Sequence, residues 1–170
     1  YYVQNPVLLS SYNKLQGKGC SQFNGTSIIK TTNNAAEGID TTKYGSNLNV
    51  DAVIIVMPSS DDPAGAGKYN DVLISDLYIE PNNGKYGIIA SDGRNLHIKN
   101  ILCRKAEYSF YVQYSFFVYI ENCVANPAYT TTENKFADSV GFSINTKDTS
   151  ARWTSVYISR CYANCCHDGY

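Results

Sequence analysis

The sequence predicts an all-β fold, a right-handed, single-stranded parallel β-helix (a solenoid) of about six coils. The first observation is a ten-residue phrase that recurs four times, with copies beginning at Asp71, Asn95, Phe117 and Ser155. The second is that small or apolar residues occupy the second, fourth, seventh and ninth positions of every copy. Such alternation is typical of strands, and the step from the fourth to the seventh position indicates a bend between two strands.

A shorter phrase follows the first one and supplies the third observation. It occupies residues 86–90, 108–112 and 140–144, and it begins again at Asp168. The copies of the ten-residue phrase are 24, 22 and 38 residues apart, and a repeat of roughly 20 residues indicates a solenoid. The last interval is long because it contains two insertions, near 127–137 and 145–153, which we expect to form loops at corners of the coils.

The repeat also predicts which side chains face the interior. The second and fourth positions should lie in the core: Val72, Ile74, Leu96, Ile98, Val118, Ile120, Val156 and Ile158. The third and fifth positions should face outward, in columns that run across neighbouring strands. Tyr119 and Tyr157 share one such column and should stack, while Asn100 and Asn122 should align at the bend. Farther along each copy, Tyr78 and Glu80 are also expected to point outward.

The N-terminal half is less regular. Two short strands are expected within 7–12 and 24–30, separated by Gly-rich turns, and another at 49–56. Polar residues at 33–46 and 58–69 predict two loops. We interpret residues 1–170 as one β-helix domain and expect it to be a segment of a longer protein, truncated at both ends.

Composition narrows the function classes. The 14 Lys and Arg residues nearly balance the 15 Asp and Glu residues, which argues against nucleic-acid binding by phosphate neutralisation. No apolar run is long enough to span a membrane. The six cysteines would allow disulfides, but three of them fall at inward positions of the repeat: Cys103, Cys123 and Cys161. We therefore expect buried small side chains, a reducing compartment during folding, and neither a metal site nor a cofactor.

Tyrosine is unusually frequent, with 15 residues against 6 Phe and 1 Trp. A tyrosine presents an apolar ring face and a polar tip, which suits stacking on carbohydrate or a subunit interface. Strands are also rich in aromatic residues for purely structural reasons. Composition alone leaves both interpretations open.

The start of the chain resembles a known family. Leu15, Gly17 and Gly19, followed by Thr26 and Ile28, are similar to the opening element of the pectate-lyase-like β-helix superfamily, and most like its bacteriophage tailspikes. Together with the repeats, the resemblance covers nearly the whole chain. It implies a polysaccharide depolymerase in the virion tail, extracellular in action and folded in a reducing bacterial cytoplasm. It also implies a homotrimer whose partner is bacterial surface polysaccharide.

Paired carboxylates are the chemistry that glycoside hydrolysis requires. Alignment of the shorter phrases offsets Asp138 and Asp168 by one coil and two residues, about 8 Å, which suits an inverting glycosidase. Glu107 is the reserve acid. The predicted sugar-binding residues are Tyr111, Tyr119, Trp153, Tyr157 and Asn145. A lyase is less favoured, because the acidic residues do not cluster in one column and no Arg stands among them. The alternatives are a non-catalytic glycan-binding segment and a structural segment of a spike or adhesin.

Overall fold

The fold consists of parallel β-strands. The computed structural model describes residues 1–21, 24–31, 51–57, 69–82, 84–126, 139–145 and 155–164, with the backbone alone for 69 and 70. In this part of the chain every regular element is a β-strand, and every strand pair is parallel. The predictions of an all-β fold and of parallel pairing are confirmed.

The larger of two sheets, sheet A, is built from the ten-residue phrases. Its main order is β1-β4-β6-β8-β10-β13; in addition, β3 pairs with β6, and β11 pairs with β8 and β14. The strands are β1 (Tyr2–Val3), β3 (Lys14–Gln16), β4 (Thr26–Lys30), β6 (Tyr69–Glu80), β8 (Gly93–Arg104), β10 (Phe116–Glu121), β11 (Val124–Asn126), β13 (Val156–Ser159) and β14 (Tyr162–Ala163).

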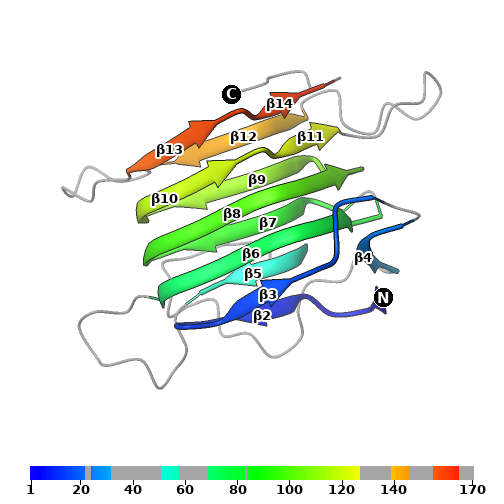
Figure 1. Cartoon of the computed structure of the whole chain (residues 1–170), viewed down its shortest axis with the longest axis horizontal. Helices are drawn as coiled ribbons and strands as arrows, with labels where there is room; N and C mark the ends of the chain where they lie inside the picture. The colour runs from blue at the N-terminus through cyan, green and yellow to red at the C-terminus, as the bar shows by residue number, and fades with distance from the viewer. Residues whose placement is uncertain are drawn as a thin grey trace.

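The second sheet, sheet B, is built from the shorter phrases and two earlier strands. Its order is β12-β9-β7-β5-β2. The strands are β2 (Val7–Leu9), β5 (Ala52–Val56), β7 (Tyr86–Ser91), β9 (Tyr108–Gln113) and β12 (Val140–Asn145). From β5 onward the chain alternates between sheets B and A, and Figure 1 shows the two sheets layered, with their arrows in opposite directions.

The predicted register of the repeat is confirmed. Val118 lies opposite Leu96 in β8 and opposite Val156 in β13. Residues at the same position of the repeat are likewise paired across β6, β8 and β10. The bend falls at the sixth position of each copy, where all four residues have a positive φ: Asp76, Asn100, Asn122 and Arg160. Asn and Asp tolerate this left-handed conformation better than most residues, which explains their place at three of the four bends.

Asn100 and Asn122 align as predicted. The side-chain amide of Asn122 donates to the amide oxygen of Asn100 (3.3 Å), and Asn100 donates to the carboxylate of Asp76 (2.8 Å). Gln16 in β3 extends the row by donating to Asp76 (3.1 Å). The bend is therefore held by side chains from successive strands.

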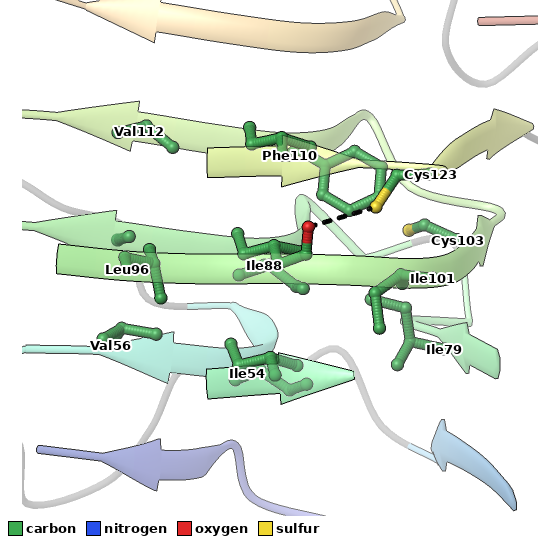
Figure 2. Close-up of a cluster of buried hydrophobic side chains, with 14 of the residues drawn as sticks. Ile54, Val56, Ile79, Ile88, Leu96, Ile101, Cys103, Phe110, Val112 and Cys123 are labelled. Carbon is green, nitrogen blue, oxygen red and sulfur yellow. Dashed lines mark hydrogen bonds between the residues drawn. The ribbon is translucent and has the colours of Figure 1, made fainter. Parts of the chain in front are cut away.

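The core lies between the two sheets. Six of the eight predicted interior residues have no exposed surface, and Val156 and Ile158 are partly buried and pack against the core. Figure 2 shows side chains from both sheets meeting there, including Ile88 and Phe110 from sheet B and Leu96 from sheet A. The rings of Phe110 and Phe142 stack, with centroids 4.9 Å apart.

The cysteines follow the prediction where they are described. Cys103 and Cys123 are fully buried in the core, and Cys161 is partly buried against it. In the described residues, these three and Cys20 are not joined in disulfides. Cys165 and Cys166 lie outside the described residues.

Two expectations about sheet A are wrong. Residues 14–16 form a strand, β3, rather than part of a turn, because they pair with β6. Tyr78 and Glu80 are buried, although their positions in the repeat predicted exposure. The Tyr78 hydroxyl donates to the Glu80 carboxylate, which also accepts from Lys105 (2.6 Å), so the polar groups satisfy one another. The predicted loops at 33–46 and 58–69 and both insertions lie largely outside the described residues, but Tyr69, assigned to the second loop, begins β6.

Candidate functional site

Outward-pointing side chains of sheet B form the candidate site, here called the tyrosine face: Tyr86, Tyr108, Tyr111, Gln113 and Asn145. In β9, Phe110 and Val112 point into the core, so the alternation of the strand turns Tyr111 and Gln113 to the other side. Asn145 lies opposite Gln113 in the neighbouring strand β12. The tyrosine face therefore gathers residues from β7, β9 and β12.

The three tyrosines pack against one another. Tyr86 and Tyr108 have ring centroids 5.4 Å apart, and Tyr86 and Tyr111 are 5.2 Å apart. Tyr108 and Tyr111 meet edge to face at 5.8 Å. The ammonium group of Lys85 lies 5.6 Å from the Tyr86 ring centroid, within the range of a cation–π contact. The rings hold one another in fixed orientations, which lowers the entropy that a ligand would have to remove.

A row of hydrogen bonds runs beside the tyrosines. Asn145 donates to the hydroxyl of Tyr111 (2.9 Å), and that hydroxyl donates to the amide oxygen of Gln113 (3.4 Å). Gln113 donates to the hydroxyl of Ser91 (3.0 Å), which donates to the carboxylate of Asp92 (2.8 Å). The row links amide, phenol, hydroxyl and carboxylate groups across three strands.

The exposure of the outer side chains of sheet B differs from strand to strand. Ile55 in β5 has no exposed surface, and Ile89 and Tyr86 in β7 are buried. Tyr111 in β9 and Asn145 in β12 are half-buried. A ligand can therefore reach this surface over β9 and β12.

The surroundings of Tyr86 keep its phenol neutral. Burial raises the pKa of Tyr86 well above its ordinary value, and neighbouring Tyr111, Tyr108 and Glu107 add to the shift. Tyr86 thus stays protonated at neutral pH. The backbone of Glu107 is fixed, since its N–H donates to Gly84 (3.2 Å) and its carbonyl accepts from Val140 (2.8 Å).

The predicted site residues fall into three groups. Tyr111 and Asn145 are in direct contact on the tyrosine face, and Glu107 lies next to it at the start of β9. Tyr119 and Tyr157 belong to sheet A. Asp138, Asp168 and Trp153 lie outside the described residues, so the proposed carboxylate pair stays a prediction.

On sheet A, the predicted column of aromatic rings is present. Tyr119 stacks on His97 at 4.7 Å between centroids, and on Tyr157 at 5.1 Å, with planes within 15° of parallel. Both ring faces of Tyr119 are therefore against neighbouring rings, which leaves its edge and hydroxyl for any ligand. Tyr157 is 56% exposed and ends the column in the described part of the sheet.

Sequence reasoning missed Tyr86, Tyr108 and Gln113 as site residues. Two signals were available. Tyr86 and Tyr108 open the first two copies of the shorter phrase, so they had to be neighbours, and Gln113 is two residues from Tyr111 on the same side of a strand.

Two ion pairs away from the tyrosine face have a structural role. Lys30 is fully buried and pairs with Asp51, while Glu80 is paired with Lys105. Breaking such a buried pair leaves an uncompensated charge, so these groups hold the structure together. Within the described ranges, no group of three His, Cys, Asp or Glu residues is placed to hold a metal ion.

No helix of the described residues combines the length and apolar character needed to cross a membrane. No family model, curated protein or solved structure matches the chain.

Proposed function

We propose that this chain is part of a tailspike-like protein that binds and depolymerises bacterial surface polysaccharide. The observation that carries the proposal is the tyrosine face, where three packed aromatic rings adjoin the amides of Gln113 and Asn145. A sugar ring has an apolar C–H face and a rim of hydroxyls, and the tyrosine face offers partners for both.

The proposed architecture is a right-handed parallel β-helix of about six coils. Its support is the regular passage of the chain between sheets B and A, together with the unbroken register of both phrases. Parallel strands joined by crossovers are almost always right-handed. Neighbouring strands in such a fold are about 4.8 Å apart, so a chain-like ligand lying across β9 and β12 would contact residues from successive coils.

For the chemistry we propose glycoside hydrolysis by two carboxylates. Asp138 and Asp168 are the proposed general acid and base, and Glu107 is the reserve acid. In the sequence Asp138 directly precedes Ser139 and Val140, and Val140 lies opposite Tyr108 in the described sheet. That neighbourhood supports placing the reaction at the end of the tyrosine face where β9 and β12 begin.

The parent protein is proposed to be a homotrimer in a virion tail that acts outside the host cell. Folding in a reducing cytoplasm is proposed for the same protein, and the reduced thiols of Cys20, Cys103, Cys123 and Cys161 are compatible with it.

A direct test offers the protein a panel of capsular and O-antigen polysaccharides, and measures binding and new reducing ends separately. Cleavage that is lost in Asp138→Asn and Asp168→Asn, with binding retained, is the expected result. Binding without cleavage would replace hydrolysis by the non-catalytic alternative. No binding to any glycan would favour a structural segment, and unsaturated uronic products would indicate a lyase.

A further inference from the structure

Two thiols lie in one column of sheet A. Cys123 connects β10 to β11, and Cys161 connects β13 to β14. The residues on either side of them are paired in register, Glu121 with Ser159 and Val124 with Tyr162. Cys123 and Cys161 are therefore directly opposite each other on adjacent strands, about 4.8 Å apart at Cα.

Both side chains point toward the core. The thiol of Cys123 reaches the carbonyl of Ile98 (3.7 Å), shown by the dashed line in Figure 2. The thiol of Cys161 reaches the carbonyl of Ile120 (3.4 Å), in the strand that leads to Cys123. A disulfide needs Cα atoms about 4.4–6.8 Å apart, which the register of these strands provides.

The same column contains apolar residues in the earlier strands. Leu77 lies opposite Ile101, and neither offers a sulfur. Cys103 belongs to a different column, where it faces Ala125. Within the described part of the chain, Cys123 and Cys161 are thus the thiols that the fold brings together.

We infer that Cys123 and Cys161 form a redox clip, in which a low-molecular-weight disulfide oxidises the two thiols to a bond that ties β13 and β14 to β10 and β11. This site is independent of the tyrosine face, which belongs to sheet B.

The reaction is two thiol–disulfide exchanges. The Cys161 thiolate attacks one sulfur of the small disulfide and releases the other half as a thiolate, leaving a mixed disulfide on Cys161. Cys123 then loses its proton to water and attacks the Cys161 sulfur, which releases the second half. Two protein thiols are oxidised, and one small disulfide is reduced to two small thiols.

The environments of the two thiols suit these roles. Cys161 is partly exposed, and the neighbouring Cys123 thiol lowers its pKa to about 6, against the opposing effects of burial and of the Glu121 charge. Burial raises the pKa of Cys123 and keeps it from small reagents. Cys161 is therefore the thiol that reacts first, and Cys123 is the one that closes the bond.

The clip would act on a strand whose interior side chains are less well buried than those of its neighbour. Val156 and Ile158 in β13 are only partly buried, whereas Val118 and Ile120 in β10 have no exposed surface. A covalent bond at Cys161 would hold β13 and β14 in place once the protein leaves a reducing compartment.

The test uses the full chain with Cys165 and Cys166 replaced by Ser, so that the tryptic peptide beginning at Cys161 has one thiol. The protein is incubated with oxidised glutathione, digested with trypsin and analysed by mass spectrometry. The expected product links the peptide of Cys123, residues 106–135, to the peptide that begins at Cys161, with the loss of two hydrogens. Amide exchange in β13 and β14 should slow at the same time.

Matched variants decide the outcome. Cys161→Ser should abolish the linked peptide, and so should Cys123→Ala, whereas Cys20→Ser should leave its yield unchanged. A mixed disulfide of Cys161 and glutathione that Cys123 does not displace, or no reaction at Cys161, would overturn the clip. If Cys123→Ala does not fold, the linked peptide in the parent protein and its loss in Cys161→Ser still decide the question.

Discussion

Asn145 in β12 donates a hydrogen bond to the phenolic oxygen of Tyr111 in β9, across 2.9 Å. Because the Tyr111 hydroxyl donates onward to Gln113, its orientation is fixed from both sides. The Asn145 amide has a further N–H and a carbonyl oxygen, which are the groups that bind sugar hydroxyls. These contacts make the junction of β9 and β12 the most informative place for substitutions that test ligand binding.

Truncation in the core should be costly. Ile120 has no exposed surface, so Ile120→Ala should lower the free energy of unfolding by about 2–5 kcal/mol, through lost burial and a cavity. Urea unfolding measures this loss. Tyr162→Ala is the control, because Tyr162 is 60% exposed and its removal should change stability by less than ~0.5 kcal/mol. Equal effects of the two substitutions would mean that the assignment of inward and outward positions is wrong.

The bend at the sixth position should be sensitive to its side chains. Asn100 has a φ of 55° and bonds to both Asp76 and Asn122. Asn100→Ala removes both bonds and places Ala in the left-handed region, so it should destabilise the fold by about 1–3 kcal/mol. Asn100→Gly removes the bonds without the backbone strain and should cost less. A larger loss for Gly than for Ala in thermal unfolding would contradict this explanation.

Asp76 should make stability depend on pH. The hydrogen bond from Asn100 lowers the pKa of its carboxyl below the ordinary value of 3.8. The stability that Asp76 contributes is therefore complete above the unfolded pKa, and it is lost as the pH falls through the lower folded pKa. Asp76→Asn should lose less stability than the parent protein when urea unfolding is compared between about pH 7 and pH 3. An unchanged loss would show that Asp76 does not contribute to this pH dependence.

Much of sheet A was predictable because two independent signals coincide. Alternation of apolar residues places Val72 and Ile74 inward, and the interruption before Leu77 marks the bend where Asp76 takes a positive φ. The strand at 14–16 has no such pattern, since its three residues become a strand through pairing with β6. The burial of Tyr78 depends equally on tertiary surroundings that a repeat does not encode.

The candidate site was predictable only in part. Period-2 alternation along β9 is enough to predict that Tyr111 points outward. Alignment of β12 with β9 then puts Asn145 opposite Gln113, on the same side as Tyr111. The position of Tyr86 in the tyrosine face depends on its neighbour Gly87, whose backbone packs closely against Cys103. A Cβ added at Gly87 would lie 2.3 Å from the sulfur of Cys103. That close approach joins the start of β7 to the core, and a sequence pattern does not contain it.

The measurement that tests the central claim most directly compares two tyrosines in a binding titration. A capsular or O-antigen polysaccharide that the protein binds is titrated against the parent protein, Tyr111→Ala and Tyr162→Ala, each verified as folded by circular dichroism. If the tyrosine face of sheet B binds the glycan, Tyr111→Ala should weaken binding about tenfold, or ~1.4 kcal/mol, and Tyr162→Ala on sheet A should bind like the parent. Unchanged affinity in Tyr111→Ala, or an equal loss in Tyr162→Ala, would contradict the assignment of glycan binding to this face.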